Sequence, residues 1–175
     1  MNKTPGRLLL LFMLSFLITG CASGLVKKNP YKGSLSPDQL DEIAMLIEKT
    51  EQEPISARSD ELRETLSLWL VRSPDISVRI YNTLELGDDY PYKQLFTTQA
   101  MLLSAKYIIR HPDMGKEHLA IQVQTLHGLL DMYELIVISE GASAKNPTLE
   151  GLLRKRTAGT LEDHVQAIVT AVGDS

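Results

Sequence analysis

Residues Lys116–Ser139, KEHLAIQVQTLHGLLDMYELIVIS, form the most apolar segment of the chain beyond residue 20 and decide its predicted fold. Apolar side chains recur in it at alternating steps of four and three residues, a spacing that places them on one face of an α-helix. These residues are Leu119, Val123, Leu126, Leu130, Tyr133 and Val137. Other apolar residues lie beside this face, so we expect the segment to be the central helix of a bundle.

Capping and stop signals divide the chain around this segment into further helices. Ser36-Pro37-Asp38-Gln39 combines an N-cap, a proline at the first helical position and the glutamine of a capping box. Trp69 falls on the apolar stripe of the second helix, which places it in the core. The predicted helices run from Ser36 to Glu53, from near Ser59 to Ser73, from Tyr92 to Arg110, from Lys116 to Ser139, from Asn146 to Arg156 and from Thr160 to Val172.

Asp75–Leu86 is the ambiguous segment. Ile76, Ile80 and Leu84 have helix spacing, while Ile76, Val78 and Ile80 alternate as in a strand. No other segment favours a strand, and no fixed repeat period is present. The sequence therefore predicts an all-α fold, a compact bundle of about five to six helices and no repeat solenoid.

The N-terminus has the layout of an export signal. Lys3 and Arg7 precede an apolar run from Leu8 to Ile18, which is shorter than the roughly 20 residues that a spanning helix needs. The run ends at Ile18-Thr19-Gly20-Cys21, which resembles the lipobox of bacterial lipoproteins. The alternative is an ordinary secretory signal in which the cysteine has no role.

The lipobox resemblance implies a lipid anchor. The Cys21 thiol would receive a diacylglyceryl group, a peptidase would cut between Gly20 and Cys21, and the new amine would be acylated. Two or three acyl chains hold a protein firmly on a bilayer, whereas one chain holds it only marginally. Ala22 stands where an aspartate would resemble an inner-membrane retention signal. We therefore expect localisation at the outer membrane, facing the periplasm.

This organisation divides the chain into three parts. Residues 1–20 are a signal peptide that is removed, residues 21–35 are a lipidated tether rich in Gly, Ser, Lys, Asn and Pro, and residues 36–175 are a single helical domain. A flexible tether of this length spans on the order of 20 Å. Because Cys21 is the only cysteine, no internal disulfide supports the fold, which must rest on its core.

The charge of the chain limits its partners. Its formal net charge is −4, and the loss of Lys3 and Arg7 with the signal peptide takes this to −6. A nucleic-acid-binding domain needs a basic face, so this balance argues against nucleic acid as a partner.

The strongest candidate site lies on the predicted central helix. His127, Asp131 and Glu134, at positions i, i+4 and i+7, lie along one helix face and could hold a divalent metal or act as acid and base. No His-Glu-x-x-His pattern supplies a second anchored histidine. With Gln124 and Gly128 the same residues form a polar stripe opposite the apolar face, and we favour a partner-facing stripe over a metal site.

Two smaller surfaces are candidate docking edges. One is an acidic loop with a tyrosine, because aromatic residues in exposed loops often anchor interfaces. The other is a basic triplet at a helix C-terminus, where the cations complement the helix dipole or meet an acidic partner or lipid headgroups. The residues of these two edges are Asp88, Asp89, Tyr90, Arg154, Lys155 and Arg156.

Motifs that would specify a reaction are missing from the sequence. It has no Gly-x-Ser-x-Gly elbow, no phosphate-binding loop and no cysteine besides Cys21. His111, Asp113 and His118 surround a helix start, where capping accounts for Asp113. We therefore predict no catalytic, cofactor-binding or metal-binding residue.

The function predicted from the sequence is that of a noncatalytic envelope lipoprotein that docks or assembles a protein partner at the membrane surface. Three alternatives stay open at this point. The chain could be a metal-dependent enzyme or metal binder that uses the central stripe, a carrier of lipid or another small ligand in a cavity lined by the central helix, or a periplasmic immunity or inhibitor lipoprotein.

Overall fold

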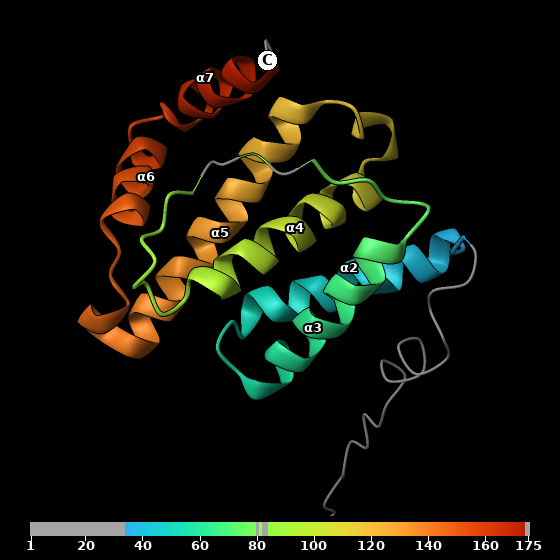
Figure 1. Ribbon diagram of the computed structural model, residues 1–175, viewed down its shortest axis with the longest axis horizontal. Coiled ribbons are helices and arrows are strands. Elements are labelled where there is room, and N and C mark those ends of the chain that lie inside the picture. The colour runs from blue at the N-terminus through green and yellow to red at the C-terminus, as the bar shows by residue number, and fades with distance from the viewer. Residues whose placement is uncertain (1–33, 80, 82–83, 174–175) are drawn as a thin grey trace, which may run out of the picture.

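The computed structural model describes residues 34–79, residue 81 and residues 84–173, and Figure 1 shows their arrangement. Within these residues the chain forms six α-helices, two short 3-10 helices and no strand, so the predicted all-α bundle is confirmed. The signal peptide, Cys21 and most of the tether lie outside the described residues. The helices are α2 (Pro37–Gln52), α3 (Ala57–Arg72), α4 (Lys93–Arg110), α5 (His118–Glu140), α6 (Pro147–Thr157) and α7 (Leu161–Gly173). No described helix is both long enough and apolar enough to cross a bilayer.

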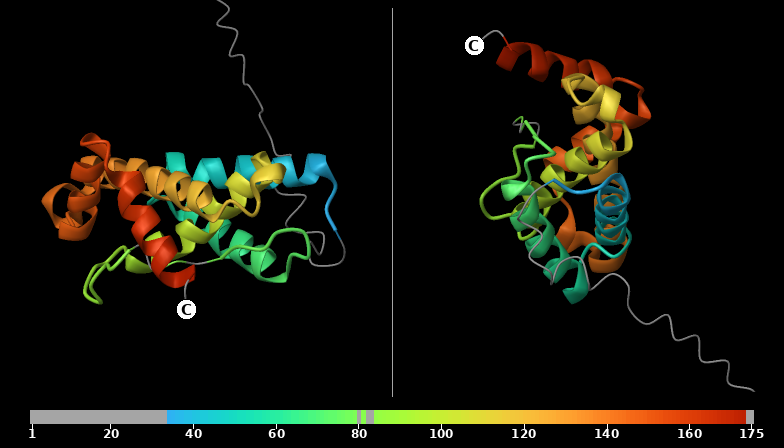
Figure 2. Two further views of the ribbon diagram at one scale, coloured as in Figure 1. Left: turned by 90° about the horizontal axis from the view of Figure 1, so that it is seen from above. Right: turned by 90° about the vertical axis from the view of Figure 1, so that its right-hand side faces the viewer.

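Helix α5 is central, as its apolar spacing predicts. It contacts α2, α4, α6 and α7. Helices α4 and α5 lie side by side, with α2 and α3 on one side of this pair and α6 and α7 on the other (Figures 1 and 2). Leu126, Leu130 and Tyr133 on α5 are fully buried, which confirms the predicted inward face.

The core has two parts that meet at α4. The α5 core joins α5 to α6, α7 and one face of α4 through residues such as Leu129, Ile136 and Phe96. The α2–α3 core packs Ile47 and Trp69 against the opposite side of α4. The predicted core position of Trp69 is confirmed.

Local capping fixes the helix starts. The Ser36 hydroxyl accepts from the Gln39 amide at 3.3 Å, and the Gln39 side chain accepts from the Ser36 amide at 2.9 Å, which completes the predicted capping box. The predicted start of α3 near Ser59 is wrong by two residues. Ser56 is its N-cap, with its hydroxyl accepting from the Ser59 amide at 3.2 Å. Asn146 caps α6 as expected.

The Asp75–Leu86 segment, for which the sequence left helix and strand open, forms neither in its described residues. Its described residues pack against both cores, Ile76 and Val78 on the α2–α3 side and Leu84 and Leu86 on the α5 side. A helix rises only 1.5 Å per residue, whereas extended chain covers roughly twice that distance, so an extended path spans the bundle with few residues. Its backbone bonds to other elements, as where the Glu85 carbonyl accepts from the Thr148 hydroxyl at 2.9 Å. Ile80, one of its predicted inward residues, lies outside the described residues.

Gly128 is not part of an exposed polar stripe, contrary to prediction. A Cβ atom at this position would lie 3.1 Å from both Cδ atoms of Leu103 on α4. The missing side chain therefore lets α4 and α5 pack closely.

Candidate functional site

A groove lies between α3 and the start of α4. Its volume is about 650 Å³, and its lining includes Ile55, Leu68, Tyr92 and Leu95 together with polar and charged side chains. None of its lining residues comes from the central helix α5, where the ligand-carrier alternative would place a cavity. We refer to this feature as the α3 groove.

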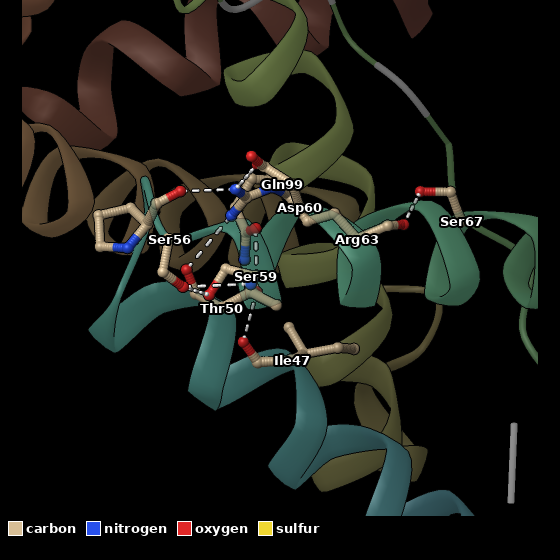
Figure 3. Close-up of polar contacts among 9 residues, drawn as sticks. Ile47, Thr50, Ser56, Ser59, Asp60, Arg63, Ser67 and Gln99 are labelled. Atoms are coloured by element: carbon tan, nitrogen blue, oxygen red, sulfur yellow. Dashed lines mark hydrogen bonds and ion pairs between the residues drawn. The ribbon is translucent and has the colours of Figure 1, made fainter. Parts of the chain in front are cut away.

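Arg63 on α3 lines the groove but is directed into the protein. Only 4% of the residue is exposed. Its Nη2 donates to the Pro54 carbonyl and to Asp60 Oδ1, each at 2.5 Å, and its Nη1 donates to the Thr50 carbonyl at 3.4 Å (Figure 3). The last carbonyls of a helix lack helical partners, and a cation near them complements the helix dipole. Arg63 therefore caps the C-terminal end of α2 and the turn that follows it.

Thr50 and Gln99 extend this polar cluster into the bundle. The Thr50 hydroxyl lies 2.7 Å from the Ile47 carbonyl and 3.1 Å from Gln99 Oε1 on α4. Gln99 is fully buried, and its Nε2 has no hydrogen-bond partner among the described residues. Figure 3 shows the side chains of α2, α3 and α4 meeting at this point, and we call Thr50, Arg63 and Gln99 the Arg63 network. The network ties the α2–α3 turn to α4.

The outward face of α3 contributes Asp60, Glu64 and Leu68 to the lining of the groove, and Val71 continues this face beyond the lining. Asp60, Glu64, Leu68 and Val71 follow one another at steps of four, four and three, which places them on one side of the helix. All four are exposed, Leu68 by 47% and Val71 by 80%. The inward face of α3 carries the buried Leu66 and Trp69. Helix α3 therefore has apolar side chains on two faces, and its outward face runs from an acidic end to an apolar end.

The predicted stripe on α5 is largely engaged within the chain. Asp131 and Glu134 point outward as expected, and Arg156 of α6 donates to them at 2.7 Å and 2.6 Å. Partial burial opposes the charge of Arg156, but the hydrogen bonds and charges of Glu134 and Asp131 outweigh it and raise the pKa of Arg156. His127 is half-buried and Gln124 is exposed. Two surfaces that were predicted separately, the acidic stripe and the basic triplet, therefore meet here.

No group of three His, Cys, Asp or Glu side chains in the described part of the chain is placed to hold a metal ion. Of His111, Asp113 and His118, which surround the predicted helix start, the two histidines contact different aromatic rings. His111 packs against Tyr107 with ring centroids 4.5 Å apart, and His118 packs against Tyr81 at 6.1 Å.

The acidic loop before α4 is only partly as predicted. Asp88 and Asp89 are exposed, and Asp88 pairs with Lys93. The prediction that Tyr90 is exposed is wrong, because only 7% of it is accessible and its hydroxyl donates to the Ala144 carbonyl at 3.0 Å. Burial raises the pKa of Tyr90. Tyr90 therefore holds this loop against the turn between α5 and α6.

The basic triplet occupies the last turn of α6, as its sequence position predicts. Arg154 and Lys155 are exposed, whereas Arg156 forms the two ion pairs with α5. A partner-facing role for Arg154 and Lys155 stays a prediction. The same holds for Gln124 and Asp89, which are also exposed.

The α3 groove was not predicted from the sequence, although one signal for it exists. Leu68 and Val71 fall outside the stripe formed by Leu62, Leu66 and Trp69. Apolar residues off the buried stripe of a helix indicate a second contact surface.

The chain matches no protein-family model, no curated protein and no solved structure.

Proposed function

We propose that the chain is a noncatalytic lipoprotein that holds a protein partner at the membrane surface, on the periplasmic side of the outer membrane in a two-membrane cell. The lipobox resemblance at Ile18–Cys21 supports the anchor. Acyl chains on Cys21 would tie the helical domain to the bilayer through the tether. The observation that carries the docking role is the exposure of Leu68 and Val71 on the outward face of α3.

Single exposed apolar residues are ordinary on protein surfaces. Leu135 and Ile138 on α5 are likewise exposed one turn apart, by 42% and 80%. Leu68 differs from them because it borders a groove that also contains Leu95 and Tyr92. An apolar area with a polar rim is typical of a protein interaction site. The acidic Asp60 and Glu64 supply that rim.

Internal contacts also favour the outward face of α3 over the docking edges predicted from the sequence. Asp131 and Glu134 are occupied by Arg156, and Tyr90 is buried. Leu68 and Val71 on α3 are exposed to solvent, and Leu68 lines the groove. The partner that this surface fits is a protein, since it combines apolar contact area with charge at its edge.

Lipid labelling and crosslinking in cells test this function together. We expect the wild-type chain to incorporate labelled palmitate and to form a crosslinked adduct with another protein in the membrane fraction. Cys21→Ser should lose the label because the acyl acceptor is gone, whereas the control Ser23→Ala should keep it. Labelling of Cys21→Ser would contradict the anchor. Failure of the wild-type chain to form an adduct in any fraction would contradict the docking role.

A further inference from the structure

We infer that the α3 groove binds a basic amphipathic helix of a partner protein, with its apolar residues on Leu68 and Val71 and its cations at Asp60 and Glu64. This inference rests on the proposed docking function and names its partner class. It starts from the order of residues along the outward face of α3. Two carboxylates occupy one end of this face and two exposed apolar side chains occupy the other.

The size of the surface fits a helix. Residues 60–71 of α3 extend over about 16 Å, the length of about three helical turns. The wall formed by Tyr92 and Leu95 makes this surface a groove rather than a flat face. Amphipathic helices bind such grooves through apolar anchors spaced three or four residues apart. Leu68 and Val71, which lie one turn apart on α3, offer contacts to two such anchors.

The carboxylates at one end of the surface set the sign of the charge that the partner carries there. At the apolar end, Arg72 is exposed next to Val71. Asp60 shares one carboxylate oxygen with Arg63, but its side chain remains 67% exposed. Glu64, one turn further along, is exposed at the rim of the groove. Arg63 itself is buried and bonds to backbone carbonyls, so it presents little charge to an incoming ligand. A partner that placed carboxylates here would face like charges, whereas lysine or arginine side chains would be attracted.

Photocrosslinking with two synthetic peptides tests this inference in isolated membranes that hold the full chain. Both peptides are biotinylated amphipathic helices with the same leucine spacing, and they carry either lysine or glutamate beside the apolar face. A photoreactive amino acid replaces Leu68 or, as the matched control, Ile138, which is 80% exposed on α5. Binding of the lysine peptide to lipid would label both positions equally.

We expect the lysine peptide to label position 68 at least about tenfold more than position 138, and about tenfold more than the glutamate peptide labels position 68. Glu64→Lys should reverse the preference between the peptides. Glu162→Lys, the same charge change on the exposed surface of α7, should leave it unaltered. Equal labelling of positions 68 and 138 by the lysine peptide would overturn the inference.

Crosslinking in living cells separates this inference from the proposed function. We expect position 68 to form an adduct with a different protein, and Glu64→Lys to abolish that adduct. An adduct of position 68 that contains two copies of this chain would overturn the inference in favour of self-association. An adduct that forms only at position 138 would overturn the inference and leave the docking function standing. If neither position forms an adduct, the inference is overturned, and the proposed function is overturned with it only if the wild-type chain also forms no adduct.

Discussion

The two cores on either side of α4 are built differently. The α5 core consists of large apolar side chains such as Leu129, Leu130 and Ile136, each fully buried. The α2–α3 half also buries Thr50, Arg63 and Gln99, whose polar atoms bond across three helices. The free energy gained by burying apolar surface depends little on the orientation of the side chains. A buried polar group, by contrast, is stable only with a hydrogen-bond partner at a defined distance and direction. Both halves bury hydrogen-bonded polar groups, such as the Tyr90 and Tyr133 hydroxyls in the α5 core. Among the described residues, however, the buried charged side chain is Arg63 of the α2–α3 half. The comparison teaches that this half depends, besides its apolar volume, on the partners of a buried charge.

Truncation of the α5 core should have the largest effect on stability. Leu130→Ala removes a fully buried side chain, and we expect it to lower the free energy of unfolding by about 2–5 kcal/mol, as measured by urea denaturation. The control His127→Ala, three residues earlier on the half-buried side of α5, should change it by less than about 0.5 kcal/mol. Equal losses from the two variants would contradict the assignment of the two faces.

Removal of the Arg63 network should come next. Arg63→Met keeps much of the side-chain volume but leaves the Thr50 and Pro54 carbonyls without their donor. We expect a loss of about 1–3 kcal/mol in the free energy of unfolding, the range for a buried polar group left unpaired. Arg58→Met, an exposed arginine in the first turns of the same helix, serves as the control. If both variants unfold at the same urea concentration, the network contributes nothing to stability.

Replacement of Gln99 should have the smallest effect. Gln99→Met removes a buried Nε2 atom that has no described partner, while Thr50 retains its contact with the Ile47 carbonyl. We expect the free energy of unfolding to stay within about 0.5 kcal/mol of wild type or to rise, because a lost hydrogen bond is offset by the loss of an unpaired donor. Thermal unfolding followed by circular dichroism measures this change. A loss above about 2 kcal/mol would mean that the amide makes an essential contact.

The α5 half could be predicted from the sequence because its determinants are local and periodic. The spacing of Leu126, Leu130 and Tyr133 identifies both the helix and its inward face. The capping residue Ser36 identifies the start of α2 for the same reason, since its partner Gln39 is three residues away.

The remaining features depend on partners that are distant in sequence. Tyr90 is buried because its hydroxyl reaches the Ala144 carbonyl, 54 residues away, which no local pattern indicates. Arg63 is buried because the end of α2 offers it two carbonyls. The Asp75–Leu86 segment carries helix and strand spacing at once, and its path is set by the distance between the elements that it connects. Leu68 is exposed although it is apolar, because the buried stripe of α3, with Leu66 and Trp69, faces away from it.

A matched pair of charge insertions tests the central claim, that the outward face of α3 is where this chain docks its partner. Leu68→Glu and Ile138→Glu each place a carboxylate at an exposed apolar position, one beside the α3 groove and one on α5. We predict that both leave the free energy of unfolding within about 0.5 kcal/mol of wild type. Only Leu68→Glu should abolish the crosslinked complex in the membrane fraction. Loss of the complex in Ile138→Glu with its retention in Leu68→Glu would contradict the account and place the docking surface on α5.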